Sequence, residues 1–310
     1  APTVLLVGHG SKSRNNLHAA GLDCGACGGQ SGEVNVRVLA QLLNDSDVRK
    51  SLIAMGYKIA GNTRFIPALH NTTTDDIECF DSPVPEKLKN LLIDAKHQAQ
   101  KERAKHYSKN LPFESDKKRN QRFQHRASDW SQVQPEWGLA GNSSFIIGPR
   151  GRTRGVDLEG KTFLHDYAWQ TDRDSSILET LMTAPMIVTN WINSQYNASV
   201  ADNNKLGSGN KVLHNALHNN IGVFEGNSGD LRIGLSKQSL YNGQRWVHQP
   251  ERLSVYIVAP NTKIYDIVQK HKMLQDLVNN DYLYLFSWEH PAVIERLYKG
   301  KWYKSHGLSM

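Results

Sequence analysis

Thr3-Val4-Leu5-Leu6-Val7 is a continuous run of apolar and β-branched residues that stops at Gly8-His9-Gly10. Such a run is typical of a strand that is buried on both faces, as in a parallel sheet. We therefore predict a central strand at residues 3–7. His9 would then lie at its carboxyl end, where open α/β sheets place their functional sites.

The residues that follow this strand predict a β-α-β unit. Apolar residues recur at helical spacing over residues 32–43, which favours a helix packed on the sheet. A second short helix is expected from Ser46, as its N-cap, to Gly56. Residues 63–69 resemble the next strand, so the pattern predicts a right-handed crossover between two parallel strands.

The rest of the chain continues the alternation of helices and strands. We expect a long amphipathic helix at 86–107, a strand at 144–148, a helix at 174–181 that Pro185 ends or kinks, and a strand, a helix and a strand at 253–258, 262–278 and 282–288. The predicted fold class is therefore α/β, with a parallel or mixed sheet and flanking helices.

The composition is that of a globular protein of 310 residues, with 39% hydrophobic residues. The longest nearly apolar stretch, 181–192, is interrupted by Pro185 and Asn190 and is shorter than the roughly 18 to 20 residues that span a bilayer. Any membrane contact is therefore expected to be peripheral. Three cysteines do not indicate a disulfide framework, and a reducing cytoplasm is the expected compartment.

Positive charge is concentrated between Lys96 and Arg126. This segment contains ten Lys or Arg residues and three acidic residues. A segment of this kind attracts nucleic acid, acidic lipid or an acidic partner, or forms a solvated arm. We interpret residues 96–134 as a basic helical arm or linker and expect no nucleic-acid partner.

The loop after the first strand gathers the residue types that bind zinc. His9 and His18 supply imidazoles, Cys24 and Cys27 supply thiols, and the loop leads into the N-terminus of a predicted helix. Exposed N–H groups there favour thiolates and anions such as bicarbonate. Residue types and spacing alone leave three readings open: a metal site, a CxxC redox pair, and structural glycines and thiols.

A family resemblance favours the first reading. A strand that ends in Gly-His, followed by Cys-Gly-Ala before a helix, is similar to half of the β-carbonic-anhydrase zinc motif. Blocks in nearly the whole chain resemble those of DabA-type inorganic carbon transporter subunits: Gly8-His-Gly-Ser, Leu22-Asp-Cys-Gly-Ala-Cys-Gly-Gly, Pro135-Glu-Trp-Gly-Leu-Ala-Gly-Asn, Phe163-Leu-His-Asp-Tyr, Met182-Thr-Ala-Pro-Met, Gly207-Ser-Gly-Asn-Lys and Gly222-Val-Phe-Glu-Gly-Asn.

The resemblance implies that His9 and Cys24 are two of four zinc ligands. In the family the other two come from an upstream Cys-x-Asp-x-Arg strand, which this sequence lacks, so the chain is expected to be the C-terminal half of the subunit. Cys27 is expected to have a structural or supporting role. Residues 1–95 would be the C-terminal part of a β-carbonic-anhydrase-like zinc domain, followed by the basic arm and a second α/β region at 135–310.

The implied activity of the complete subunit is zinc-dependent, one-way hydration of CO₂ to bicarbonate, with this chain alone inactive. The implied partner is an antiporter-like integral membrane subunit, which places the protein on the cytoplasmic face of the membrane. We expect docking through the apolar and aromatic residues of 182–196. The alternative is a metal-free scaffold or binding domain that docks on an acidic or membrane-protein partner.

Overall fold

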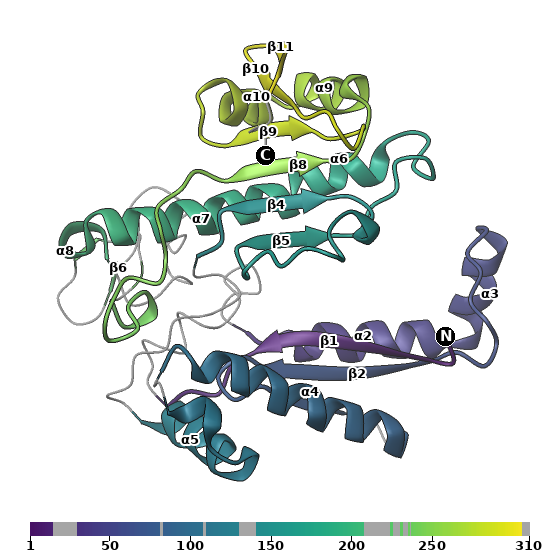
Figure 1. Ribbon diagram of the computed structural model, residues 1–310. Coiled ribbons are helices and arrows are strands. Elements are labelled where there is room, and N and C mark those ends of the chain that lie inside the picture. Colours follow the sequence, from purple (N-terminus) through teal and green to yellow (C-terminus); the bar gives the residue numbers. More distant parts are fainter. Residues whose placement is uncertain are drawn as a thin grey trace. The chain divides into compact units, whose positions relative to one another are not determined.

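The computed structural model describes residues 1–14, 30–80, 83–107, 110–129, 141–207, 224–225, 230–231, 235 and 237–305. The helices are α2 (Glu33–Asn44), α3 (Ser46–Ala54), α4 (Glu86–Ala104), α5 (Asp116–Ser128), α6 (Ser176–Thr183), α7 (Pro185–Ala201), α8 (Asn203–Leu206), α9 (Asn261–Lys270) and α10 (Lys272–Asn279), with short 3₁₀ turns at Leu111–Phe113, Arg150–Arg152 and Lys237–Ser239. The strands are β1 (Thr3–Gly10), β2 (Arg64–Asn71), β3 (Asp76–Cys79), β4 (Ser144–Ile147), β5 (Thr162–His165), β6 (Phe224–Glu225), β7 (Asp230–Leu231), β8 (Ser254–Ile257), β9 (Tyr284–Ser287), β10 (Glu295–Tyr298) and β11 (Lys301–Lys304). Helices and strands alternate, so the predicted α/β class is confirmed (Figure 1).

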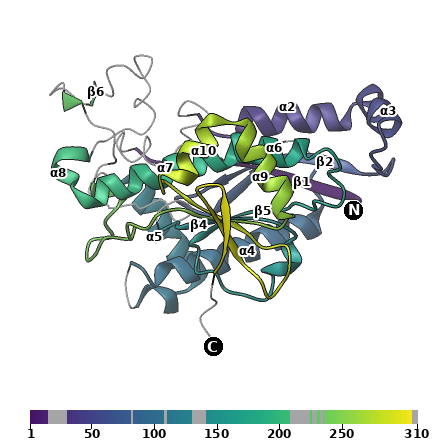
Figure 2. The same ribbon diagram turned by 90° about the horizontal axis from the view of Figure 1, so that it is seen from above.

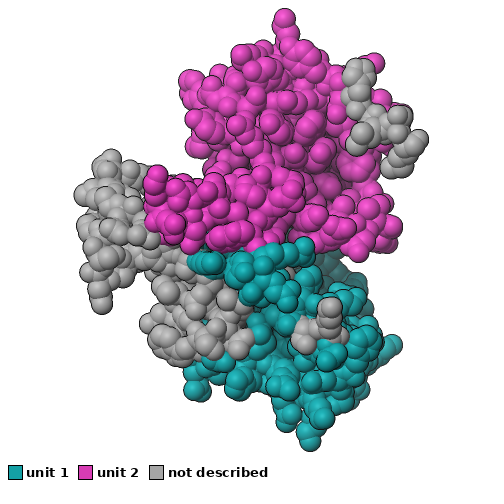
Figure 3. Space-filling view, turned by 60° about the vertical axis from the view of Figure 1, so that its left-hand side comes forward, with its two compact units in different colours: residues 1–136, 208–245 teal, residues 137–207, 246–310 magenta. Residues whose placement is uncertain are grey.

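The chain forms two compact units, which Figure 3 colours separately. Unit 1 comprises Ala1–Glu136 and Ser208–Arg245, and unit 2 comprises Trp137–Gly207 and Trp246–Met310. The three-part division predicted from the sequence rests on composition and resemblance, and it stays a prediction.

Unit 1 contains a three-stranded sheet in the order β1-β2-β3. β1 and β2 are parallel, so the predicted strand–helix–strand unit is confirmed, and β3 returns antiparallel to β2. Figures 1 and 2 both show α2 on one face of β1 and β2 and α4 on the other. The sheet is therefore covered on both faces, as the apolar first strand requires.

Within the described part of the chain, the first strand does not have the two neighbours expected of a central strand. β1 lies at an edge of its sheet, with β2 as its one neighbour in the strand order. Most of its side chains are half-buried, and Val7 is exposed. The local sequence shows that a strand is apolar, but it does not show which strands pair with it.

The start of α3 also differs from its prediction by one residue. Asp45, not Ser46, is the N-cap, because its Oδ1 accepts hydrogen bonds from the backbone N–H groups of Asp47 and Val48 at 2.9 and 3.0 Å. These bonds lower the pKa of the Asp45 carboxyl. Gly56 follows the helix with a φ of +93°, as a glycine at a helix end allows.

Unit 2 is built on a six-stranded sheet in the order β11-β10-β9-β8-β4-β5. β5, β4, β8 and β9 run parallel, and β10 and β11 add an antiparallel edge. The core is formed by buried side chains of these strands and of the helices packed on them, among them Phe145, Ile147, Leu178, Met182, Met186, Val255, Ile257, Ile264, Ile267, Leu274 and Leu285.

Two expectations in this region differ from the structure. Only part of the apolar surface expected at 182–196 is accessible, because Met182, Met186 and Tyr196 are each 0% exposed and lie inside unit 2, whereas Val188, Trp191 and Ile192 are half-buried; docking there stays a prediction. The helix expected at 262–278 is two helices, separated at His271, whose backbone is extended with φ −118° and ψ 106°. Pro185 ends α6 as predicted, and it then occupies the first turn of α7, where its missing N–H costs nothing.

The basic segment is helical in α4 and α5, and part of it is packed. Arg119 is 2% exposed and donates from Nη1 to the carbonyl of Glu114 at 2.8 Å. Phe123 is 1% exposed and meets the ring of Tyr107 edge-on, with 5.6 Å between centroids. Phe123 and Tyr107 form a small core with Ala104 and Leu111, in contrast to the solvated arm considered above. Among the described residues, no helix is both long enough and apolar enough to cross a bilayer.

Candidate metal centre

β1 carries His9 to its carboxyl end, as the sequence predicts. In the parallel register His9 pairs with His70 of β2. Paired residues of parallel strands project to the same face of the sheet, so two imidazoles lie side by side there. The sequence analysis did not identify His70.

Two glycines allow the chain to return against His9. The N–H of Gly32 donates to the carbonyl of His9 at 2.6 Å. A Cβ added at Gly8 would lie 2.7 Å from the carbonyl oxygen of Gly32, and one added at Gly32 would lie 2.9 Å from the backbone nitrogen of His9. The end of the glycine-rich segment is therefore held against the predicted ligand by a contact that no larger residue permits.

The other predicted ligand residues cannot be placed. Cys24, Cys27 and His18 lie within residues 15–29, outside the described part of the chain. Among the residues that are described, no group of three or more His, Cys, Asp or Glu side chains is arranged to hold a metal ion. The zinc ligands therefore stay a prediction, for which the structure supplies the position of His9.

A buried carboxylate lies beside this edge of the sheet. Asp75, in the turn after β2, has a side chain that is 1% exposed, and its Oδ1 lies 3.1 Å from His70 Nε2 and 3.0 Å from Arg103 Nη1. The same Arg103 nitrogen donates to the carbonyl of Thr72 at 2.6 Å. Asp75 Oδ2 is buried without a hydrogen-bond partner among the described residues.

The turn is fixed further by Asn71, the last residue of β2. Its Oδ1 accepts from the backbone N–H of Lys12 at 3.0 Å and from the hydroxyl of Thr73 at 2.7 Å. These bonds tie the segment after His9 to the segment after His70. The carboxyl ends of β1 and β2 are therefore cross-linked by side chains.

Two helices of the basic segment complete the support. Lys96 of α4 binds Asp76 Oδ1 at 2.6 Å, and Gln124 of α5 binds Asp76 Oδ2 at 2.8 Å. Burial opposes ionisation of this carboxyl, but its hydrogen bonds from Lys96, Thr74 and Gln124 outweigh burial and lower the pKa of Asp76. Part of the basic segment thus neutralises acidic residues of unit 1.

A sequence signal for these residues was present. Asn71-Thr72-Thr73-Thr74-Asp75-Asp76 is a polar run directly after an apolar strand, and the carboxyl ends of neighbouring parallel strands meet at one edge. This pattern predicts polar groups beside His9. It does not predict that Arg103 and His70 are their partners.

The glycine contact leads to a testable expectation. Gly8→Ala should destabilise unit 1 by about 1–3 kcal/mol, because the new methyl group overlaps the Gly32 carbonyl and the backbone must move. Gly61→Ala is the matched control, since a Cβ there has no neighbour within 4 Å. Hydrogen exchange of unit 1 amides measures both effects. Equal effects of the two substitutions would show that the contact at Gly8 is not constrained.

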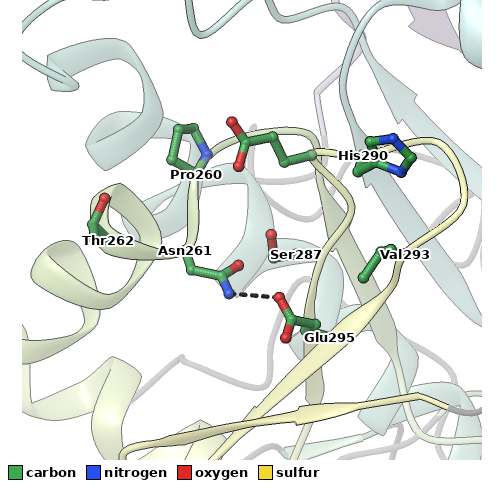
Figure 4. Close-up of a pocket in the computed structure, with 8 residues that line it drawn as sticks. Pro260, Asn261, Thr262, Ser287, His290, Val293 and Glu295 are labelled. Carbon is green, nitrogen blue, oxygen red and sulfur yellow. Dashed lines mark hydrogen bonds between the residues drawn. The ribbon is translucent and has the colours of Figure 1, made fainter.

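Unit 2 contains a separate pocket at the carboxyl ends of β8 and β9, with a volume of about 290 Å³. It is lined by Pro260, Asn261, Thr262, Ser287, Glu289, His290, Val293 and Glu295 (Figure 4). Asn261 Nδ2 donates to Glu295 Oε2 at 2.7 Å, and the Ser287 hydroxyl donates to the carbonyl of Ala259 at 3.1 Å. These lining groups are satisfied within the protein, so the pocket does not identify a ligand.

Comparisons with known proteins assign the family. Residues 1–283 match the family model described as "Probable inorganic carbon transporter subunit DabA". Proteins with that name from Marinomonas sp. and Hydrogenovibrio crunogenus are 59% and 55% identical, over 98% of this chain and 38% and 37% of their own lengths. The chain therefore spans less than two fifths of these relatives. No solved structure matches it. By its family model and by its identity to these relatives, the chain belongs to the DabA family of probable inorganic carbon transporter subunits.

Proposed function

We propose that this chain contributes two zinc ligands, His9 and Cys24, to an inorganic carbon transporter subunit that hydrates CO₂ to bicarbonate in one direction. The observation that carries the proposal is the position of His9. It lies at the carboxyl end of a parallel strand, with the end of the glycine-rich segment held against it. The names of the relatives, which describe inorganic carbon transporter subunits, support the substrate class.

The chemistry of the donors fits zinc. An imidazole and a thiolate are both preferred zinc ligands, and a catalytic zinc site keeps one position for water or substrate. The chemistry that zinc supplies in such a site is a lowered pKa of bound water, about 7, which provides a nucleophile near neutral pH. The remaining protein ligands are proposed to come from sequence outside this chain.

The residues of this chain would hold the site in shape. His70, Asp75 and Arg103 form one hydrogen-bonded set beside His9, and Asn71 ties the ends of β1 and β2 together. Such supporting contacts fix the orientation of ligands and reduce the reorganisation that binding requires. Arg103 already binds Asp75 and the Thr72 carbonyl, so its role here is structural support.

We further propose that the subunit acts at the cytoplasmic face of the membrane, attached to an antiporter-like integral membrane partner. The relatives are named as subunits of a transporter, which implies at least one other subunit. The exposed basic side chains of α4 and α5 are a feature available for such a contact.

Substitution of the two proposed ligands tests the zinc assignment. In the complete subunit, Cys24→Ala and His9→Ala should reduce bound zinc to background and abolish carbon uptake, because each removes a ligand. Cys27→Ala is the matched control and should keep both. Metal analysis of the purified protein and uptake of labelled inorganic carbon give the two readouts. Full zinc occupancy in the Cys24→Ala protein would refute the assignment.

The same measurement distinguishes the alternatives. A complete subunit that holds no zinc, yet binds its membrane partner, supports the metal-free scaffold. A titratable dithiol without zinc supports the redox pair. The remaining cysteine, Cys79, is a free thiol on β3, and burial raises its pKa, so it is not poised for thiolate chemistry.

A further inference from the structure

The free edge of β1 combines an apolar sequence with an unpaired position. β1 ends the strand order of its sheet, although its residues are of the kind found in central parallel strands. Val7 is 45% exposed in the middle of the strand. An apolar edge strand open to water is a template for strand addition, and proteins normally cover or interrupt such an edge.

The hydrogen bonds show which backbone groups are open. The carbonyls of Pro2 and Gly10 accept from Arg64 and Thr72, so the even-numbered residues of β1 point their backbone groups toward β2. The odd-numbered residues therefore point theirs toward the edge. His9 uses its carbonyl to bind Gly32. For Thr3, Leu5 and Val7, the described residues supply no strand on that side.

Helix α2, which packs on β1 and β2, is apolar on two sides. Ala40 is buried against the sheet, with Val36 and Leu43 half-buried at helical spacing from it. On the outer side four large apolar residues are 45–67% exposed: Val34, Val38, Leu39 and Leu42. Contiguous exposed apolar residues mark a contact surface, so the outer side of α2 indicates a second contact layer.

We infer that a strand and a helix from the remainder of the family's longer chain cover these two features, the strand pairing with β1 and the helix packing on α2. The edge of β1 offers unpaired backbone groups for a strand, and the outer side of α2 offers an apolar face for a helix. The occupant is available, since more than half of the length of the 59% identical relative lies outside the match. Being in the same polypeptide gives it a high effective concentration.

This inference does not depend on zinc, because it concerns how the sheet is completed. A second copy of the chain and the membrane partner are the competing occupants, and the experiment separates them. A two-fold pair of copies would join β1 to itself, which makes protection depend on protein concentration.

Hydrogen exchange at alternate residues of β1 provides the test. In the complete subunit, the amides of Thr3, Leu5 and Val7 should exchange at least about a hundredfold more slowly than in the 310-residue chain, because they gain partners in a ladder. The amides of Val4, Leu6 and Gly8, which face β2, are internal controls and should be slow in both. The complete subunit is measured with and without its membrane partner, and at two concentrations.

Four outcomes would overturn the inference. Slow exchange of the odd-numbered amides in the 310-residue chain would show that it covers its own edge. Protection that appears only with the membrane partner, or only at high concentration, would assign the edge to that partner or to a second copy. Fast exchange under every condition would show that the edge is open.

A substitution on α2 tests the helix contact. Val38→Glu in the complete subunit should speed exchange of the odd-numbered amides of β1 at least about tenfold, because a carboxylate cannot be buried unpaired beneath a helix. Val156→Glu is the matched control: Val156 is also an exposed valine, 60% against 50% for Val38, but lies in unit 2. Equal effects of the two variants would refute the contact on α2. If Val38→Glu does not fold, the exchange pattern of the unsubstituted subunit still decides.

Discussion

Asp75→Ala should lower the free energy of unfolding of unit 1 by about 3–5 kcal/mol, because it removes the acidic partner of a buried ion pair and leaves Arg103 uncompensated. The Asp75 side chain is 1% exposed and that of Arg103 is 21% exposed, so water replaces the lost contact only in part. Its φ is +60°, a backbone conformation that alanine tolerates less well than aspartate. Both effects act in the same direction.

Asp75→Asn is the matched variant. Asparagine keeps the size of the side chain, an acceptor oxygen and the tolerance of positive φ, and it removes the charge. We expect a smaller loss than for alanine. Native-state hydrogen exchange measures each unit separately, and the amides of unit 2 serve as the unaffected reference. A loss below about 1 kcal/mol for Asp75→Ala would show that the turn relaxes without this carboxylate.

Acidification should destabilise unit 2 through His248. Burial lowers the pKa of His248 from its ordinary value of 6.5 to about 4. The geometry agrees, since Nδ1 accepts from the N–H of Gly141 at 3.1 Å and Nε2 lies 2.6 Å from Asn197 Oδ1. A proton on Nδ1 would remove the bond from Gly141. The native state therefore holds the neutral imidazole.

The direction of the pH effect follows from this lowered pKa. Below pH 6.5 the unfolded chain binds a proton that the folded chain rejects, so stability is full above pH 6.5 and falls as the pH drops toward 4. The pKa of His248 differs by about 2.5 units between the unfolded and folded states, which corresponds to a loss of about 3 kcal/mol in the free energy of unfolding. His248→Gln should remove this part of the pH dependence. The measurement is the difference in pH slope between the two proteins over pH 4–7, and identical slopes would contradict the assignment.

The sequence alone determined the local elements and one part of the candidate site. The run at residues 3–7, the helical spacing of 32–43 and the next strand at 63–69 each carry their own periodicity, and the structure places β1, α2 and β2 there. The position of His9 at a strand end follows directly, because the glycines that end the apolar run are visible in the sequence. Two expectations were wrong by small amounts for the same local reason, since a helix cap at Asp45 and a break at His271 depend on single side chains and backbone angles.

Tertiary structure decided which residues meet. His9 and His70 are paired by strand register across 61 positions of the sequence, and Asp75 meets Arg103 because α4 packs on the sheet. Apolar character likewise did not distinguish a core helix from a surface. Met182, Met186 and Tyr196 are buried in unit 2, whereas equally apolar residues of α2, such as Val38 and Leu42, are exposed. Hydrophobicity is a property of each residue, but burial depends on the partners that surround it, and those are set by the packing of elements far apart in the chain.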